Sequence, residues 1–404
     1  MERPPHIVSL DLVRGLDVWL MLFVNEMAGV TDTPAFLRHM PGGADGMTIT
    51  DVVFPAFLFI TGMAVPLALG ARRVRGDSRA AVWRHVLGRT AVLVFLGVLM
   101  INAEHASASA VVPPALCNVL MTAAVVLVFA EPGAEGRGGG WRWSGLVLLA
   151  LLILVYRADG VSGWIQIRPY WWGILGLIGW AYLVAASTYL LAGERPAVLV
   201  GVVALLYLVA LADEANAIGV LRAIRPVVHV GRALGAHGAL VLSGAVLGLA
   251  LRRHRAEARP AAGFVIPALG FALACAVAGG LVHALHDVHP AFEISKIRAT
   301  AAWCLLSAAW TALAWTATYA SVDVAGHGRW PRAIATAGEN ALVIYLLAPL
   351  LLSVFEVIGV GLGWNPYESL GRSLAVGVVR SVVFAWVVVR LSGWMRARGL
   401  RLRL

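Results

Sequence analysis

The feature that most constrains this chain is a series of apolar runs, each about 20 residues long, joined by short polar segments. Runs of this length match a helix that crosses a bilayer. In lipid the backbone must satisfy its own hydrogen bonds, which helices do. Hydrophobic residues make up 60% of the chain and charged residues only 13%, more apolar surface than a water-soluble domain could bury. We therefore predict an all-α, polytopic integral membrane protein with one domain over residues 1–404.

Twelve apolar runs can be placed along the chain, and the seventh and eighth are the shortest, so we predict about ten to twelve transmembrane helices. An even number of crossings leaves both termini on one side of the membrane. With that side taken as cytoplasmic, 21 of the 32 basic residues fall in inner segments and 9 in outer segments, as the positive-inside rule requires. The runs lie at 12–30, 49–71, 86–103, 112–130, 142–156, 170–191, 196–212, 237–251, 262–285, 299–321, 336–358 and 373–392.

The remaining composition excludes several other classes of protein. The net charge of +10 comes from short basic clusters between apolar runs, which indicates topology signals and lipid contact, and no nucleic acid is expected as a partner. All three cysteines lie within apolar runs, so no disulfide framework is expected. The start of the chain has no pattern of a cleavable signal, and EPGAEGRGGG is expected to form a flexible inner loop. Because nearly every basic residue is Arg, the sequence also indicates a GC-rich bacterial genome.

The first two apolar runs and the loop between them hold the polar residues with the clearest chemical meaning. Asn25, His39 and Asp51 are expected near the outer face, and glycines in the loop would let it fold back over the helix ends. An imidazole, a carboxylate and an amide suit acyl transfer as base, orienting group and oxyanion donor. From spacing alone the alternatives stay open: Asp51 could only cap a helix, Asn25 could join two helices, and His39 could be solvated.

SLDLVRGLDVWLMLFVNEMAG, followed by a loop histidine and ITDVVFPAFLFITG, resembles the heparan-α-glucosaminide N-acetyltransferase family of transmembrane acyltransferases. The resemblance is strongest over residues 7–70, and RPYWWGILGLIGWAYLVAAS, FEISKIRATAAW and GENALVIYL resemble later family segments. It implies that His39 is the catalytic histidine, flanked by Asn25 and Asp51. It also implies that acetyl-CoA from the cytoplasm supplies an acetyl group. The lumenal domain of the animal members has no counterpart in this sequence, so we expect a cell-envelope carbohydrate, acetylated on an amine or hydroxyl, as the acceptor.

Further polar residues are assigned to the two substrates. Arg14, at the cytoplasmic end of the first run, is predicted to meet the CoA phosphates, although it could instead pair with Asp11 or Asp17. Lys296, the only lysine, and Asn118 are predicted to line the acceptor site at the outer face. Arg380 is expected either to pair with an interior carboxylate or to mark the site.

These assignments lead to a membrane acyltransferase in the bacterial inner membrane, and the competing interpretation is a transporter that exports an envelope precursor. The protein is expected to contact the lipid bilayer, and it could form a homo-oligomer. HALHDVHP places three histidines close together in sequence, which raises the question of zinc. It matches no established zinc motif, so no metal is expected.

Overall fold

The computed structural model describes residues 7–129, 138–327 and 332–398, and within these ranges the protein is helical with no β-strand. Residues 130–137, which hold most of the loop predicted to be flexible, lie outside the described residues, as do residues 1–6, 328–331 and 399–404. The α-helices are α1 Val8–Met27, α2 Ile49–Val74, α3 Arg79–Glu104, α4 Pro114–Phe129, α5 Gly138–Val155, α6 Gly173–Ala192, α7 Pro196–Glu214, α8 Gly219–Ile224, α9 His237–Ala256, α10 Val265–His283, α11 Ala301–Tyr319, α12 Arg332–Glu339, α13 Ala341–Leu362, α14 Pro366–Ser369 and α15 Leu374–Ala397.

The prediction of an all-α membrane bundle is confirmed. Among the described residues, eight helical segments are long and apolar enough to cross a bilayer, and they correspond to α2, α3, α6, α7, α9, α10, α13 and α15. The other predicted runs fall on α1, α4, α5 and α11. One run is divided: residues 336–358 do not form a single helix, because the chain breaks at Asn340 between α12 and α13. The number of ten to twelve crossings stays a prediction.

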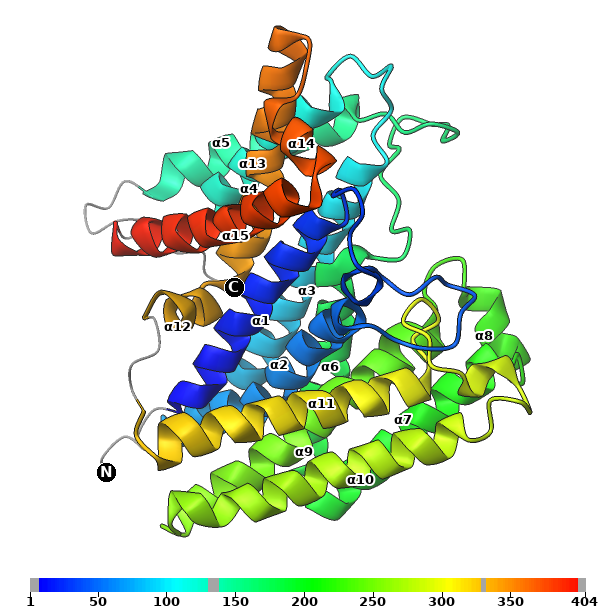
Figure 1. Cartoon of the computed structure of the whole chain (residues 1–404), viewed down its shortest axis with the longest axis vertical. Coiled ribbons are helices and arrows are strands. Elements are labelled where there is room, and N and C mark those ends of the chain that lie inside the picture. Colours follow the sequence, from blue (N-terminus) through cyan, green and yellow to red (C-terminus); the bar gives the residue numbers. More distant parts are fainter. Residues whose placement is uncertain (1–6, 130–137, 328–331, 399–404) are drawn as a thin grey trace.

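The helices run obliquely through the elongated bundle (Figure 1), in which α10 and α11 lie side by side at the lower edge. The start of α1 and the end of α15 both lie at the left of this view, while the loops after α1 and α10 meet at the right. Large apolar side chains on the free face of α10 are exposed, as in Ile266, Leu273 and Leu281. An apolar outer face of this kind suits contact with lipid.

The closest helix packing in the core joins α2 to α9 through glycines on both helices. A Cβ atom at Gly62 of α2 would lie 1.8 Å from the carbonyl oxygen of Val241 on α9. On α9, Gly244 and Gly248 would likewise meet the backbone of α2, at 2.0 Å and 2.2 Å from the nearest carbonyl oxygens. Small residues allow such backbone approach in membranes, where packing rather than hydrophobic burial drives helix association. These glycines hold α2 in a fixed position against the centre of the bundle.

We predict that Gly62→Ala will destabilise the protein, because the new methyl group can be placed only by forcing α2 away from α9. Overpacking of this kind costs about 1–3 kcal/mol. Gly270→Ala is the matched control, since a Cβ at this position of α10 would meet nothing within 4 Å. Thermal unfolding in detergent should give a lower midpoint for Gly62→Ala and an unchanged or slightly higher midpoint for Gly270→Ala. Equal midpoints for the two variants would show that α2 and α9 have room for a methyl group at Gly62, which would contradict their close packing.

Candidate active site

The loop between α1 and α2 is fastened to the start of α2 by two threonines. Thr50 donates its hydroxyl to the carbonyl of Leu37 at 2.8 Å, and Thr48 donates to the carbonyl of Arg38 at 2.7 Å. Both contacts fix the backbone immediately before His39. The position of this histidine is therefore set by the first turn of α2 rather than by the free course of a long loop.

Asp51 lies in that first turn, and its two carboxylate oxygens have different tasks. Oδ2 accepts from the backbone N–H of Thr48 at 3.1 Å and of Met40 at 3.0 Å, which completes a capping box and holds the loop. Oδ1 lies 2.8 Å from Nδ1 of His39. The Asp51 side chain is only 1% exposed, so the carboxylate itself is shielded from water while its partners are partly exposed. The two interpretations that the sequence left open, helix cap and histidine partner, are both realised by one residue.

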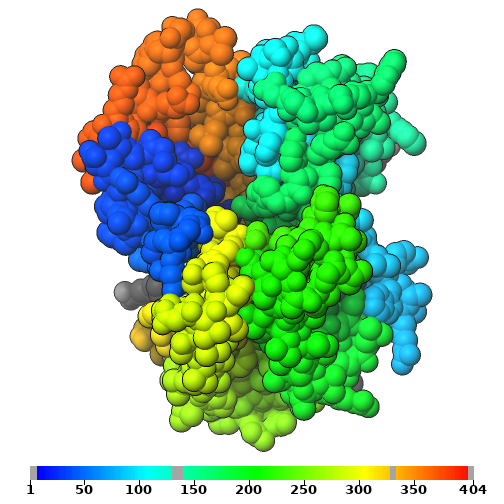
Figure 2. All heavy atoms as spheres, turned by 90° about the vertical axis from the view of Figure 1, so that its right-hand side faces the viewer, coloured from blue at the N-terminus to red at the C-terminus, as the bar shows by residue number. Residues whose placement is uncertain are grey.

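Lys296 reaches the same pair from the loop between α10 and α11. Its Nζ lies 3.0 Å from Nδ1 and 3.4 Å from Nε2 of His39, and 3.8 Å from Oδ1 of Asp51. The loop is held there because Gly46 donates its N–H to the carbonyl of Ile294 at 2.9 Å. Figure 2 shows the first loop in blue directly beside this yellow segment. Burial lowers the pKa of the Lys296 amine from its ordinary value, and the charge of Asp51 offsets part of that shift.

The contacts of His39 decide which of its ring nitrogens can act as a base. An ionised carboxylate only accepts hydrogen bonds, so Nδ1 must carry the proton that faces Asp51. Nε2 then bears the lone pair, with Nζ of Lys296 3.4 Å away, and the side chain is 43% exposed, which leaves it open to an incoming group. A histidine oriented by a buried carboxylate is the arrangement that general-base catalysis requires.

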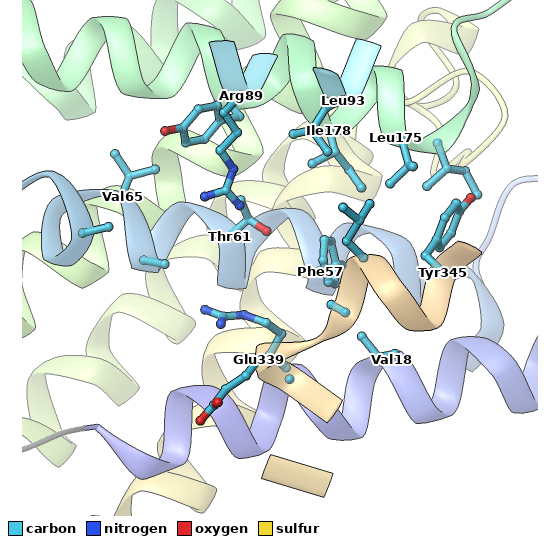
Figure 3. A pocket seen from close by; sticks show the side chains of 18 of the residues that line it. Val18, Phe57, Thr61, Val65, Arg89, Leu93, Leu175, Ile178, Glu339 and Tyr345 are labelled. Carbon is cyan, nitrogen blue, oxygen red and sulfur yellow. The ribbon is translucent and has the colours of Figure 1, made fainter. Parts of the chain in front are cut away.

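A cavity of about 460 Å³ lies behind this site, between α1, α2, α3, α6, α12 and α13. Its wall on α2 is formed by residues that recur every three or four positions from Phe54 to Leu69, which is one face of the helix. At 1.5 Å per residue this wall is about 22 Å long, or roughly two-thirds of the thickness of a bilayer core. Figure 3 shows Thr61 and Phe57 along this wall, with Tyr345 at one end.

The other end of the cavity is basic. Arg14, His85 and Arg89 line it, together with Glu339. Figure 3 shows Arg89 reaching from α3 toward Thr61. The guanidinium of Arg89 lies 5.0 Å from the centre of the Tyr182 ring, and its buried Nε has no hydrogen-bond partner among the described residues. Guanidinium groups suit phosphate recognition, because their planar donors match phosphate oxygens.

The sequence-predicted residues are not all brought together. Arg14 pairs with Asp11 at 3.2 Å, one of the alternatives left open, and it also lines the cavity, while its contact with the CoA phosphates stays a prediction. Asn25 is exposed in the last turn of α1, and within the described residues no hydrogen bond joins its amide to His39 or Asp51. Asn118 donates to the hydroxyl of Ser353 on α13 at 2.6 Å, a contact between helices. The catalytic role of Asn25 and the acceptor role of Asn118 stay predictions.

Of the two interpretations that the sequence left open for Arg380, the structure shows the pairing with an interior carboxylate: its guanidinium lies 3.9 Å from the Glu26 carboxylate and donates to the Glu26 carbonyl at 2.8 Å. The sequence analysis did not single out His85 and Arg89 as cavity-lining residues, because both lie in a basic stretch that the positive-inside rule already explains. Nor did it place Lys296 against His39. The signal available was that Lys296 is the single lysine in an arginine-rich chain.

Comparison with known proteins places the chain in a family. The family described as "Domain of unknown function (DUF5009)" matches residues 7–216, slightly more than half of the chain. The chain belongs to this family. It is also similar to two curated proteins, the heparan-alpha-glucosaminide N-acetyltransferases of Homo sapiens and Mus musculus. These matches confirm the resemblance that the first two helices indicated.

The similarity to the two acetyltransferases is partial. The human protein is 30% identical over 102 residues, which cover 25% of this chain and 15% of that protein. The mouse protein is 31% identical over 96 residues, which cover 24% and 14%. The matched stretch is thus a small part of each relative.

We predict that Asp51→Ala will destabilise the protein much more than His39→Ala. Removing Asp51 leaves the half-buried N–H groups of Met40 and Thr48 without their acceptor, at a combined cost of about 1–3 kcal/mol. His39 is partly exposed, so its removal should cost about 1 kcal/mol or less. Thermal unfolding and limited proteolysis of the 38–48 loop would measure both effects. Similar stability of the two variants would contradict the double role of Asp51.

Proposed function

We propose that the protein is a membrane acetyltransferase that takes an acetyl group from cytoplasmic acetyl-CoA and transfers it to an amine or hydroxyl of a carbohydrate on the opposite, periplasmic side. The observation that carries this proposal is the 2.8 Å contact between His39 Nδ1 and buried Asp51, which leaves Nε2 as a base. The similarity to two N-acetyltransferases supports the same reaction class. We infer a single multi-pass domain in a bacterial inner membrane, with both termini in the cytoplasm.

The cavity gives the donor a route across most of the bilayer. The phosphates of CoA would bind at the basic end, beside Arg14, His85 and Arg89. The thin pantetheine arm would then follow the α2 wall, which is apolar apart from Thr61. The wall ends at Phe54, three residues after Asp51, so it stops about one helical turn short of the carboxylate that holds the histidine. His39 does not line the cavity, so the thioester reaches it only when the side chains around Phe54 move aside.

The chemistry then follows from the tautomer of His39. Nε2 takes a proton from the acceptor amine or hydroxyl as its nitrogen or oxygen bonds to the acetyl carbon. Asp51 stabilises the imidazolium that forms, and the ammonium of Lys296 is near enough to stabilise charge on the carbonyl oxygen. The tetrahedral intermediate collapses by breaking the carbon–sulfur bond, and the thiolate of CoA takes up the proton from His39. The products are the acetylated acceptor and free CoA.

Donor binding can be tested at the basic end of the cavity. Arg14→Ala and Arg89→Ala each remove a charged donor that we assign to the phosphates. Such a bond contributes about 1.5–3 kcal/mol, so affinity for CoA should fall by about 10- to 100-fold in each variant. Arg75→Ala is the control, since Arg75 is exposed beyond the end of α2 and does not line the cavity. Isothermal titration with CoA would measure the loss, and unchanged affinity in both variants would refute this donor site.

The central test is His39→Ala, followed with labelled acetyl-CoA and a carbohydrate acceptor. Loss of a general base lowers a rate by about 10²–10⁴, while CoA affinity should remain at the wild-type level because His39 lies away from the basic end. Asp51→Asn should have a milder effect, since an amide can still orient the ring, and Asn25→Ala should lower turnover without abolishing CoA binding. Wild-type transfer by well-folded His39→Ala would refute the mechanism. Acceptor movement across proteoliposomes without thioester consumption would indicate a transporter instead.

A further inference from the structure

A second polar cluster lies on the same side of the bundle, where the loop after α1 meets the end of α10. Nε2 of His283, the last residue of α10, lies 2.9 Å from Oδ2 of Asp45. The ring of His286 stacks on that of His283, with their centres 4.9 Å apart. One ligand atom from each of the three residues lies within 4.8 Å of the other two. Two imidazoles and a carboxylate therefore converge from segments more than 230 positions apart in sequence.

Zinc would replace one hydrogen bond of this cluster, the one in which Nε2 of His283 donates to Oδ2 of Asp45, and would take both atoms as ligands in place of the shared proton. Nδ1 of His286 lies 3.0 Å from the carbonyl oxygen of His283, and since a carbonyl only accepts, Nδ1 carries the proton and Nε2 the lone pair. A backbone carbonyl on one ring nitrogen is the usual way in which proteins orient a metal-binding histidine. Oδ1 of Asp45 accepts from the N–H of Ile294 at 2.7 Å, so Oδ2 is the oxygen that faces the imidazole of His283.

The charge of Asp45 also fits a cation. Asp287 adds a further carboxylate nearby, with Oδ1 at 3.3 Å from Nε2 of His286.

We propose that Asp45, His283 and His286 bind a zinc ion. Two imidazole nitrogens and one carboxylate oxygen form a set that zinc accepts, and water or Asp287 would complete four ligands. With zinc–ligand distances of about 2.0–2.1 Å, tetrahedral ligands lie about 3.3 Å apart. The Asp45 and His283 atoms need to separate by only a few tenths of an ångström to reach this spacing, while His286 must move closer.

The zinc would join the loop that carries His39 to the segment that carries Lys296. Asp45 precedes Gly46, whose N–H already bonds to the carbonyl of Ile294. Lys296 lies two residues after Ile294. The ion would thus strengthen an existing contact between the two loops. Its effect on catalysis rests on the proposed function, but its binding does not.

The test measures metal binding directly on purified full-length protein that carries no polyhistidine tag. The protein is stripped of metal and titrated with Zn²⁺ against a chromogenic chelator, and with Co²⁺ for its visible absorption. We expect one ion per chain, with affinity reduced by about 100-fold or more in Asp45→Asn, His283→Gln and His286→Gln, a larger loss than the 10- to 100-fold typical of outer-sphere partners. His289→Gln is the matched control: it lies in the same segment, but its Nδ1 is occupied by the N–H of Ala291 at 3.0 Å.

Hydrogen exchange provides a second readout that does not depend on activity. Zn²⁺ should slow exchange at the Gly46 amide in the wild type and in His289→Gln, but not in Asp45→Asn. If the wild type binds zinc no more tightly than His283→Gln, the cluster is an ion pair only and the proposal is wrong. Unchanged affinity in Asp45→Asn would equally overturn it, because the loop would then contribute no ligand. Loss of acetyl transfer in His39→Ala with normal zinc binding would show that the zinc site does not depend on the acetyltransferase activity.

Discussion

The site depends on a single buried carboxylate that makes two kinds of contact at once. Asp51 accepts backbone N–H groups that begin α2 and hold the preceding loop, and with its other oxygen it orients His39. The helix cap and the catalytic geometry therefore cannot vary independently. A change that loosens the first turn of α2 also releases the histidine, whereas a change at the histidine leaves the turn intact. Lys296 adds the third charge, supplied by a loop from the other half of the chain.

The fold was largely predictable from the sequence, because in a membrane the length of an apolar run determines the length of a helix. The exceptions have local causes. The run at 336–358 breaks at Asn340, which apolar periodicity does not detect, and α12 then packs so closely on α1 that a Cβ at Gly15 would lie 1.8 Å from the carbonyl oxygen of Ile334. Such backbone approach depends on tertiary contacts.

The site was predictable only where its members are neighbours in sequence. His39 and Asp51 are 12 positions apart and share a motif, so the pair was found, and the structure brings it together. The contact between Lys296 and His39 spans 257 positions, and that between His283 and Asp45 spans 238. No spacing rule connects residues so distant. The three histidines of HALHDVHP were weighed as a zinc site from sequence, but the carboxylate that would complete it comes from the first loop.

The tight contact of α2 with α9 has a consequence for the position of the transferred group. α2 provides both the long wall of the cavity and the carboxylate that holds the base, so the distance between them is set within one helix. The close approach of Gly62, Gly244 and Gly248 to the facing backbone restricts sliding or tilting of that helix. When CoA is anchored at the basic end, the acyl carbonyl carbon, which is bonded directly to the pantetheine sulfur, arrives at the same depth whatever chain follows it. α2 therefore fixes where the carbonyl carbon stops, and not how long an acyl chain can be.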